Sequence, residues 1–193
     1  MDGKQIESEP DQGELTRRYT EKAVSFIKDH LKEPFFLYFA HTFPHIPLYT
    51  NARFEGTSKR GLYGDVVEEI DWSVGEVLKA LRENGLDENT FVIFTSDNGP
   101  HHEGGADPDF FKSYGPFRGI KRDVYEGGIR IPMVAWCPGT IKAGAQSDHI
   151  SAFWDVMPTL AELTGTVLPE KTDGISFLPT LLSKKDQQAH DYL

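Results

Sequence analysis

Stretches with helical spacing of apolar residues alternate along the chain with short, continuous apolar runs. Residues 15–32, "LTRRYTEKAVSFIKDHLK", carry apolar side chains at intervals of three and four, which predicts an amphipathic helix. The same spacing recurs over residues 66–81 and predicts a longer helix that ends near Gly85. Residues 151–165, "SAFWDVMPTLAELTG", predict a third helix that stops at Gly165.

Three runs of strand length lie between these helices. They read "PFFLYFAHT" (34–42), "NTFVIFTSD" (89–97) and "IPMVAWCPG" (131–139). Continuous apolar runs are typical of strands that are buried on both faces. The element order therefore predicts an α/β fold with a central, mostly parallel sheet flanked by helices. Because no internal repeat or low-complexity linker interrupts it, we expect residues 1–193 to form a single domain.

Composition narrows the classes of partner. The chain has 193 residues, 38% of them hydrophobic, which is enough for one domain with a core. A net charge of -10 argues against a nucleic-acid backbone as partner. No stretch reaches the roughly 18–20 apolar residues that span a bilayer, so we expect no membrane span. Cys137 is the single cysteine, so no internal disulfide can form.

Ligand-type side chains are densest in "TSDNGPHHEGG", residues 95–105. Asp97 and Asn98 lie at the C-terminal end of a predicted strand, and His41 and His45 lie at the same end of the preceding one. Ligand sites of open α/β sheets form outside the carboxyl ends of the strands. Carboxylate and amide oxygens suit Ca²⁺ or Mg²⁺, and imidazoles suit proton transfer. The alternative is a polar turn, because D-N-G is also a common turn sequence.

A second cluster is basic, although the chain as a whole is acidic. It lies in "GPFRGIKRDVYEGGIRIP", residues 115–132, and comprises Arg118, Lys121, Arg122 and Arg130. Cations can hold a tetrahedral oxyanion and stabilise charge on a leaving oxygen. The pair Gly127 and Gly128 indicates backbone in close approach to another group. A solvated basic loop is the alternative interpretation.

These stretches resemble the sulfatase family of the alkaline phosphatase superfamily, and they occur in the order that this family shows. The matching segments are "PFFLYFAHTFPHIPL", "FVIFTSDNGP", "GPFRGIKRDVYEGGIRIPMVAWCPG", "SDHISAFWDVMPTLAELTG" and "DGISFLPTLL". The combination of S/T-D-N-G with a later K-x-x-x-x-E-G-G-x-R-x-P is specific. The resemblance covers the chain from about residue 15 to its end.

The resemblance implies roles for four residues. Asp97 and Asn98 match the family's ligands for a divalent cation, usually Ca²⁺, with Mg²⁺ as an alternative. Lys121 matches the lysine that contacts the sulfate and the leaving-group side. His45 matches the histidine that faces the sulfate ester and helps to protonate the departing oxygen.

Other polar residues of these loops are weaker candidates. His101, His102 and Arg118 are candidate substrate-binding residues, with the alternatives that the histidines only line the rim and that Arg118 braces its loop. His41 closes a predicted strand, and we expect it to be packed or hydrogen-bonded instead of catalytic.

One part of the family pattern is absent. Sulfatases use a formylglycine made from C/S-x-P/A-x-R, and residues 1–193 contain no such motif; Cys137 is followed by Pro-Gly-Thr. The early pair of Asp ligands is absent too. The resemblance thus implies a partial catalytic domain that lacks the N-terminal nucleophile region, the early strands and the C-terminal subdomain. For the isolated chain we expect pairing, as a dimer or with a missing companion segment, or marginal stability.

The function implied by the resemblance is hydrolysis of sulfuric esters, either aryl sulfates or sulfated sugars. Two alternatives remain open. The chain is a non-catalytic fragment or pseudoenzyme that binds anions, or it belongs to a phosphate or phosphonate ester hydrolase of the same superfamily. Members of the family are mostly secreted, periplasmic or lysosomal.

Overall fold

The computed structural model describes residues 5–168 and 171–192. Within them the chain forms two compact units. Unit 1 consists of residues 5–87 and 95–133, and unit 2 consists of residues 88–94 and 134–192 apart from 169–170. The candidate residues named above, from His41 to Arg130, all lie in unit 1.

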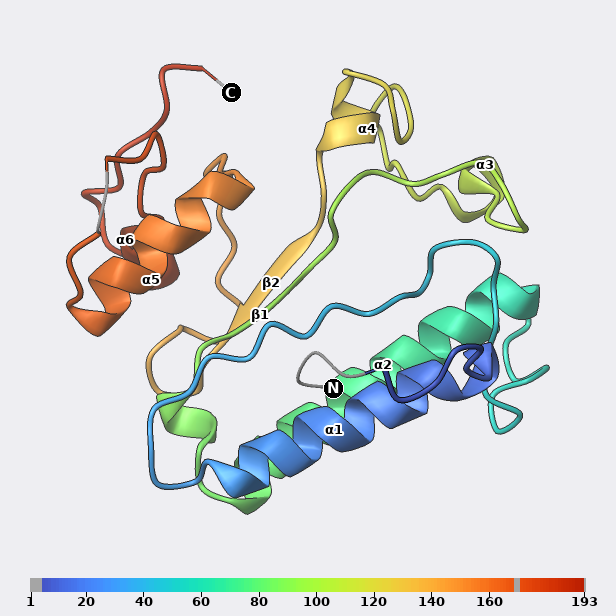
Figure 1. The fold of residues 1–193 in the computed structure, drawn as a ribbon. Coiled ribbons are helices and arrows are strands. Elements are labelled where there is room, and N and C mark those ends of the chain that lie inside the picture. Colours follow the sequence, from blue (N-terminus) through green and yellow to red (C-terminus); the bar gives the residue numbers. More distant parts are fainter. Residues whose placement is uncertain (1–4, 169–170, 193) are drawn as a thin grey trace. The chain divides into compact units, whose positions relative to one another are not determined.

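Unit 1 is built on two long helices that lie side by side, α1 (Leu15–Asp29) and α2 (Gly61–Glu83) (Figure 1). A short 3-10 turn, η1 (Gln12–Glu14), leads into α1. Both helices confirm the predictions from apolar spacing, and Gly85 follows α2 with a φ of 66°. This left-handed conformation suits glycine and ends the helix where the sequence indicated.

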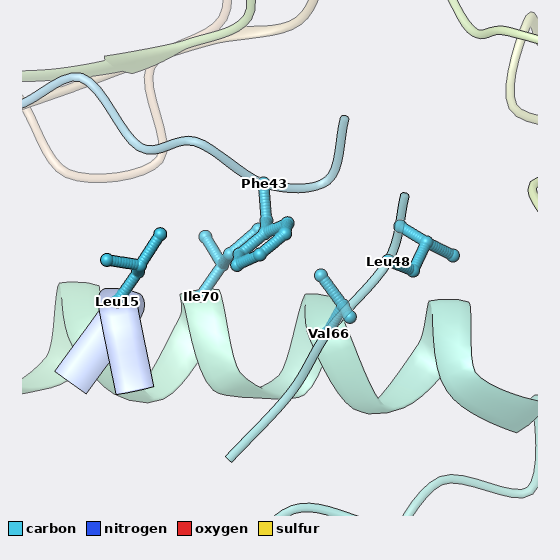
Figure 2. Packing of buried hydrophobic residues seen from close by; sticks show 5 residues of the cluster. All are labelled: Leu15, Phe43, Leu48, Val66 and Ile70. Carbon is cyan, nitrogen blue, oxygen red and sulfur yellow. The ribbon is translucent and has the colours of Figure 1, made fainter. Parts of the chain in front are cut away.

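The core of unit 1 joins these helices to the segment that carries His45. Figure 2 shows its side chains, which come from both helices and from the loop between them: Leu15, Phe43, Leu48, Val66 and Ile70. Phe43 and Leu48 flank His45 in the sequence, and both are buried. Burial of apolar surface therefore fixes the loop on both sides of His45.

The first predicted strand, residues 34–42, is extended but forms no β-ladder within the described residues. Its side chains alternate: Phe35, Leu37 and Phe39 are partly buried, whereas Phe36 is 70% and Tyr38 is 81% exposed. The prediction of a strand buried on both faces is thus wrong for the described chain. A strand requires a hydrogen-bonded neighbour, and apolar composition does not supply one.

The other two predicted strands pair with each other as β1 (Val92–Thr95) and β2 (Met133–Trp136). The pairing is antiparallel, because the Thr95 hydroxyl donates to Pro132 O (2.9 Å) and Gly99 N donates to Gly128 O (2.9 Å) further along. The expectation of a mostly parallel sheet is therefore corrected for the described residues. Only two four-residue helices, α3 (Pro108–Phe111) and α4 (Glu126–Ile129), are described between these strands. Both are too short for the crossover helix that parallel strands usually need.

Unit 2 contains η3 (Phe153–Asp155), α5 (Val156–Thr164) and α6 (Leu178–Leu181), and η2 (Asp87–Asn89) lies at its boundary. Helix α5 confirms the third predicted helix, and Gly165 caps it in the left-handed conformation. The buried Asp155 carboxylate accepts from Ala152 N, Ile175 N and His190 Nε2, each at 2.8 Å. Of the helices in the described residues, none has the length and apolar character needed to cross a bilayer.

Candidate functional site

The Asp97 loop (residues 96–105) and the Lys121 loop (residues 115–130) are joined by backbone hydrogen bonds. Gly99 N donates to Gly128 O at 2.9 Å, and Lys121 N donates to Pro100 O at 2.8 Å. Both bonds lie close to candidate residues, one beside Asn98 and the other on Lys121 itself. The two clusters that are separated in the sequence are therefore neighbours in unit 1.

Glycines make close backbone contact possible both between the two loops and within the Lys121 loop. A Cβ at Gly99 would lie 2.0 Å from Gly127 O, and a Cβ at Gly127 would lie 2.1 Å from Gly119 O. A Cβ at Gly128 would lie 2.3 Å from Asp123 O. Every one of these distances is far below a van der Waals contact, and the opposing atom is backbone. The expectation of close approach at Gly127 and Gly128 is confirmed.

Asp97 and Asn98 offer two oxygen ligands at the start of the Asp97 loop. The Asp97 side chain is exposed, and the Asn98 amide nitrogen donates to Gly99 O at 2.9 Å, which leaves its Oδ1 for a cation. These oxygens fit a hard divalent cation in kind, but Ca²⁺ takes six to eight oxygen ligands. Across the described ranges no group of three or more His, Cys, Asp or Glu is placed to hold a metal. These two residues could therefore supply at most part of a coordination shell.

Lys121 opens a tight turn. Asp123 N donates to Ile120 O, and Ile120 N donates back to the Asp123 carboxylate, both at 2.9 Å. Arg122, within this turn, has a φ of 82°, in the left-handed region that glycine favours. Since its N–H donates to Pro100 O, the Lys121 backbone is held against the Asp97 loop.

His45 lies on the exposed part of the His45 loop (residues 43–58), between two cis peptide bonds, Phe43–Pro44 and Ile46–Pro47. Its Nδ1 is 2.7 Å from Ile46 O. Because a carbonyl oxygen only accepts hydrogen bonds, Nδ1 must carry the proton. The other ring nitrogen, Nε2, is then the atom that can exchange a proton with a ligand.

The His45 loop also touches the Asp97 loop. A Cβ at Gly104 would lie 2.3 Å from Ile46 Cγ2, and one at Gly105 would lie 3.8 Å from Leu48 Cδ1. Ile46 follows His45 directly. Hence the loops that carry His45, Asp97 and Lys121 meet within one unit.

Buried acids of α2 hold the far part of the His45 loop. Glu69 accepts from the Thr50 hydroxyl at 2.8 Å and from Asn51 N at 2.9 Å. Asp65 accepts from Gly56 N at 2.9 Å and from Ser58 N at 2.8 Å. Both carboxylates are buried, so these bonds replace part of the water that the acids lose and organise the loop; Glu69 Oε1 has no hydrogen-bond partner in the described chain.

His41 is packed against α2, in agreement with the expectation. Its Nε2 lies 3.3 Å from the Ser73 hydroxyl, and Ser73 Oγ lies 2.5 Å from Thr20 Oγ1. Its Nδ1 is buried and has no hydrogen-bond partner in the described chain. Burial lowers the pKa of His41, because removal from water disfavours the charged ring.

The remaining candidates lie on the Asp97 and Lys121 loops. His101 Nε2 is 3.4 Å from Glu103 Oε1, and His102 is exposed. The Arg118 guanidinium lies over the Tyr125 ring, 3.9 Å from its centroid, so its stacking occurs within its own loop. These contacts are compatible with histidines that only line the rim and with an Arg118 that braces its own loop. They do not identify a ligand.

Sequence reasoning missed Glu103. This carboxylate links the two loops, because Arg122 Nη1 also lies 3.5 Å from its Oε1. Glu103 lies in the stretch "HHEGG", but only the two histidines of that stretch were considered as candidates. The buried Asp65 and Glu69 were missed as well, because helical periodicity does not tell a buried acid from an exposed one.

Comparison with known proteins identifies the class. The Sulfatase family profile matches residues 3–166. The chain is 44% identical over 177 residues to N-acetylgalactosamine-6-sulfatase of Mus musculus, which covers 87% of this chain and 33% of the relative. It is 38% identical over 183 residues to steryl-sulfatase of Homo sapiens, covering 93% and 31% respectively. The chain belongs to the sulfatase family.

A solved structure agrees with this membership. The PsFucS1 sulfatase from Pseudoalteromonas sp. superposes with a TM-score of 0.86 at 29% identity, over 98% of this chain and 39% of that one. The chain thus shares the fold of a sulfatase domain and spans about a third of the length of the curated relatives it matches.

Proposed function

We propose that the protein to which these residues belong hydrolyses sulfuric esters. The observation that carries the proposal is the hydrogen bond from Lys121 N to Pro100 O at 2.8 Å, which places the lysine beside the loop of Asp97 and Asn98. A cation beside oxygen ligands for a divalent metal is what a tetrahedral dianionic ester requires. We also propose that both units are parts of one catalytic domain, because the family match spans residues of each.

In this proposal the chain's own residues bind the ester and assist departure of the alcohol. The Lys121 ammonium donates to a sulfate oxygen and to the bridging oxygen, where negative charge develops as the S–O bond breaks. His45, whose Nδ1 proton is held by Ile46 O, carries a second proton on Nε2 and transfers it to the departing oxygen.

Asp97 and Asn98 would supply two ligands for Ca²⁺, or for Mg²⁺ as the alternative. When bound, such a cation draws charge from the sulfate oxygens and makes the sulfur more electrophilic. Residues 1–193 contain no formylglycine motif and therefore supply no nucleophile of that kind for the attack on sulfur.

Two further functions compete with this one. Phosphate or phosphonate ester hydrolysis uses similar chemistry on a tetrahedral anion, and binding of an anion without turnover needs only the cations. Identity of 38–44% to sulfatases named for a sugar sulfate and a steryl sulfate favours the sulfuric ester.

The test uses the complete reading frame that contains these residues. Para-nitrophenyl sulfate and para-nitrophenyl phosphate are compared at equal concentration, with and without a calcium chelator. We expect release of nitrophenol from the sulfate ester and its loss with chelator. Turnover of the phosphate ester alone would favour the second function, and tight sulfate binding without product would favour the third.

A further inference from the structure

Ile46, the residue after His45, connects three parts of unit 1. Its partly buried side chain packs against the apolar core cluster shown in Figure 2. The same side chain meets the Asp97 loop, because a Cβ at Gly104 would lie 2.3 Å from Ile46 Cγ2 and 2.9 Å from Ile46 Cβ. Its carbonyl oxygen accepts a hydrogen bond from His45 Nδ1 at 2.7 Å. Ile46 thus contacts the core, the Asp97 loop and the imidazole.

The imidazole of His45 depends on this neighbour for its position. The His45 side chain is exposed, and Ile46 O is its hydrogen-bond partner within the described ranges. Fixing an exposed side chain in one orientation costs rotational entropy. A general acid must nevertheless lie within hydrogen-bond reach of the oxygen that it protonates. The placement of Nε2 therefore follows the backbone of residues 45–46, and the Ile46 side chain ties this backbone to the Asp97 loop.

Gly104 has a role beyond its turn. It has a φ of 63°, and the turn of residues 103–106 is closed by Ala106 N, which donates to Glu103 O at 3.1 Å. Gly56, in the His45 loop, has a similar φ of 71°, but a Cβ there would meet nothing within 4 Å. A left-handed backbone favours glycine at both positions. The short distance to Ile46 at Gly104 indicates that this glycine also makes room for the isoleucine side chain.

We propose that Ile46 is a positioning residue: packed on Gly104, it holds the His45 imidazole beside the Asp97 loop, where Nε2 protonates the departing oxygen. The inference rests on the proposed sulfuric ester hydrolysis and adds a residue that acts through His45 alone. As the S–O bond breaks, its electron pair goes to the departing oxygen. The Nε2–H bond breaks at the same time, and its proton forms the O–H bond of the alcohol.

The test compares phenyl sulfate with para-nitrophenyl sulfate in the complete reading frame. The nitro group stabilises the departing phenolate, so this ester needs little help from a general acid. Ile46→Ala should lower kcat/KM on phenyl sulfate by about tenfold or more and on para-nitrophenyl sulfate much less, because part of the general acid catalysis is lost. Ile46→Val keeps the branched Cβ that packs on Gly104 and should restore most of the ratio.

Gly104→Ala should lower the same ratio by displacing Ile46 from the opposite side of the contact. Gly56→Ala is its matched control, because it also places a Cβ on a left-handed backbone but displaces nothing. Ile70→Ala is the control for Ile46→Ala, since it truncates another isoleucine of the same packing and should lower Tm without changing the ratio. An unchanged ratio in Ile46→Ala and Gly104→Ala would overturn the proposal, as would an equal fall in the two controls.

The ring nitrogens of His45 supply a readout that needs no turnover. In protein labelled with ¹⁵N-histidine, in alkaline buffer where imidazoles are neutral, the wild type should show one His45 tautomer with the proton on Nδ1. His45→Gln assigns the signals. Ile46→Ala should shift both signals toward averaged values, whereas Ile70→Ala should leave them in place. If the wild type cleaves neither ester, the proposed function fails and these signals alone decide the positioning role: unchanged signals in Ile46→Ala would overturn it.

Discussion

The His45 loop and the pair of loops that carry Asp97 and Lys121 are held by different kinds of contact. Buried carboxylates of α2 receive backbone and hydroxyl donors from residues 50–58 of the His45 loop. The Asp97 and Lys121 loops are instead held by backbone bonds between glycine-containing segments, such as Gly99 to Gly128. The His45 loop is thus held by particular acidic side chains. The contact between the Asp97 and Lys121 loops instead requires glycines, which have no side chain.

This difference explains why the contacts of the two regions are not equally predictable from the sequence. The glycine pair and the D-N-G motif can be recognised in the sequence, because only glycine permits such close backbone contact. A buried acid on a long helix cannot be recognised from its residue type, because Glu and Asp also occupy solvent-exposed helix faces. Substitutions should therefore affect the two regions by different routes.

Gly127→Ala should have the largest effect on stability. Its Cβ would meet Gly119 O at 2.1 Å and Arg118 O at 2.7 Å, and neither atom belongs to a flexible side chain. We expect a loss of about 3 kcal/mol in the free energy of unfolding, together with loss of the proposed sulfatase activity, because the backbone around Lys121 must shift. Urea denaturation measures the first effect.

Gly75→Ala is the control for that substitution. A Cβ at Gly75, in α2, would meet nothing within 4 Å. It should stabilise the helix by about 0.5–1 kcal/mol. If Gly127→Ala were as well tolerated as Gly75→Ala, the close backbone contact within the Lys121 loop would be contradicted.

Glu69→Ala tests the side-chain-held loop and should have the next largest effect. The Thr50 hydroxyl and Asn51 N would lose their acceptor, at a cost of about 2–3 kcal/mol. Glu83→Gln, on the same helix, alters an exposed ion pair with Lys79 (3.9 Å) and should change stability by less than about 0.5 kcal/mol. Equal unfolding midpoints for both variants would show that the acid does not hold the loop.

The smallest expected effect is a pH dependence at His41. Its pKa is lowered from 6.5 by burial, so below that pH the unfolded chain binds a proton that the folded chain does not. Stability should therefore fall as the pH drops from about 7.5 to about 5.5. His41→Gln, which can keep a contact with Ser73, should show a shallower decline, whereas His102→Gln, at an exposed site, should match the wild type. Parallel declines in all three proteins would rule out a contribution of His41.

Much of the fold follows from apolar spacing, and the failures have a common cause. Helices α1, α2 and α5 were predicted because a helix satisfies its own backbone hydrogen bonds, so local sequence is sufficient. Strands need a partner, and residues 34–42 lack one in the described chain. The direction of β2 was also beyond local pattern, because it depends on the path of residues 96–132.

The candidate site was predicted in part. Gly127 and Gly128 predicted close approach to another group, but not that the Asp97 loop lies there. The resemblance to sulfatases singled out Asp97, Asn98, Lys121 and His45, whose roles remain predictions. Glu103 was not singled out, because its link to Arg122 depends on how two loops fold back on each other. Such a contact has no signature in either loop alone.

The most direct measurement is the kcat/KM of Lys121→Ala on para-nitrophenyl sulfate, in the complete reading frame, with Lys59→Ala as an exposed control. Because the Lys121 backbone is already held by Pro100 O, truncation of its side chain should leave Tm unchanged. We expect kcat/KM to fall by about a hundredfold or more, as for the loss of a donor to developing charge. Turnover equal to that of Lys59→Ala and the wild type would contradict a sulfate site built from these loops.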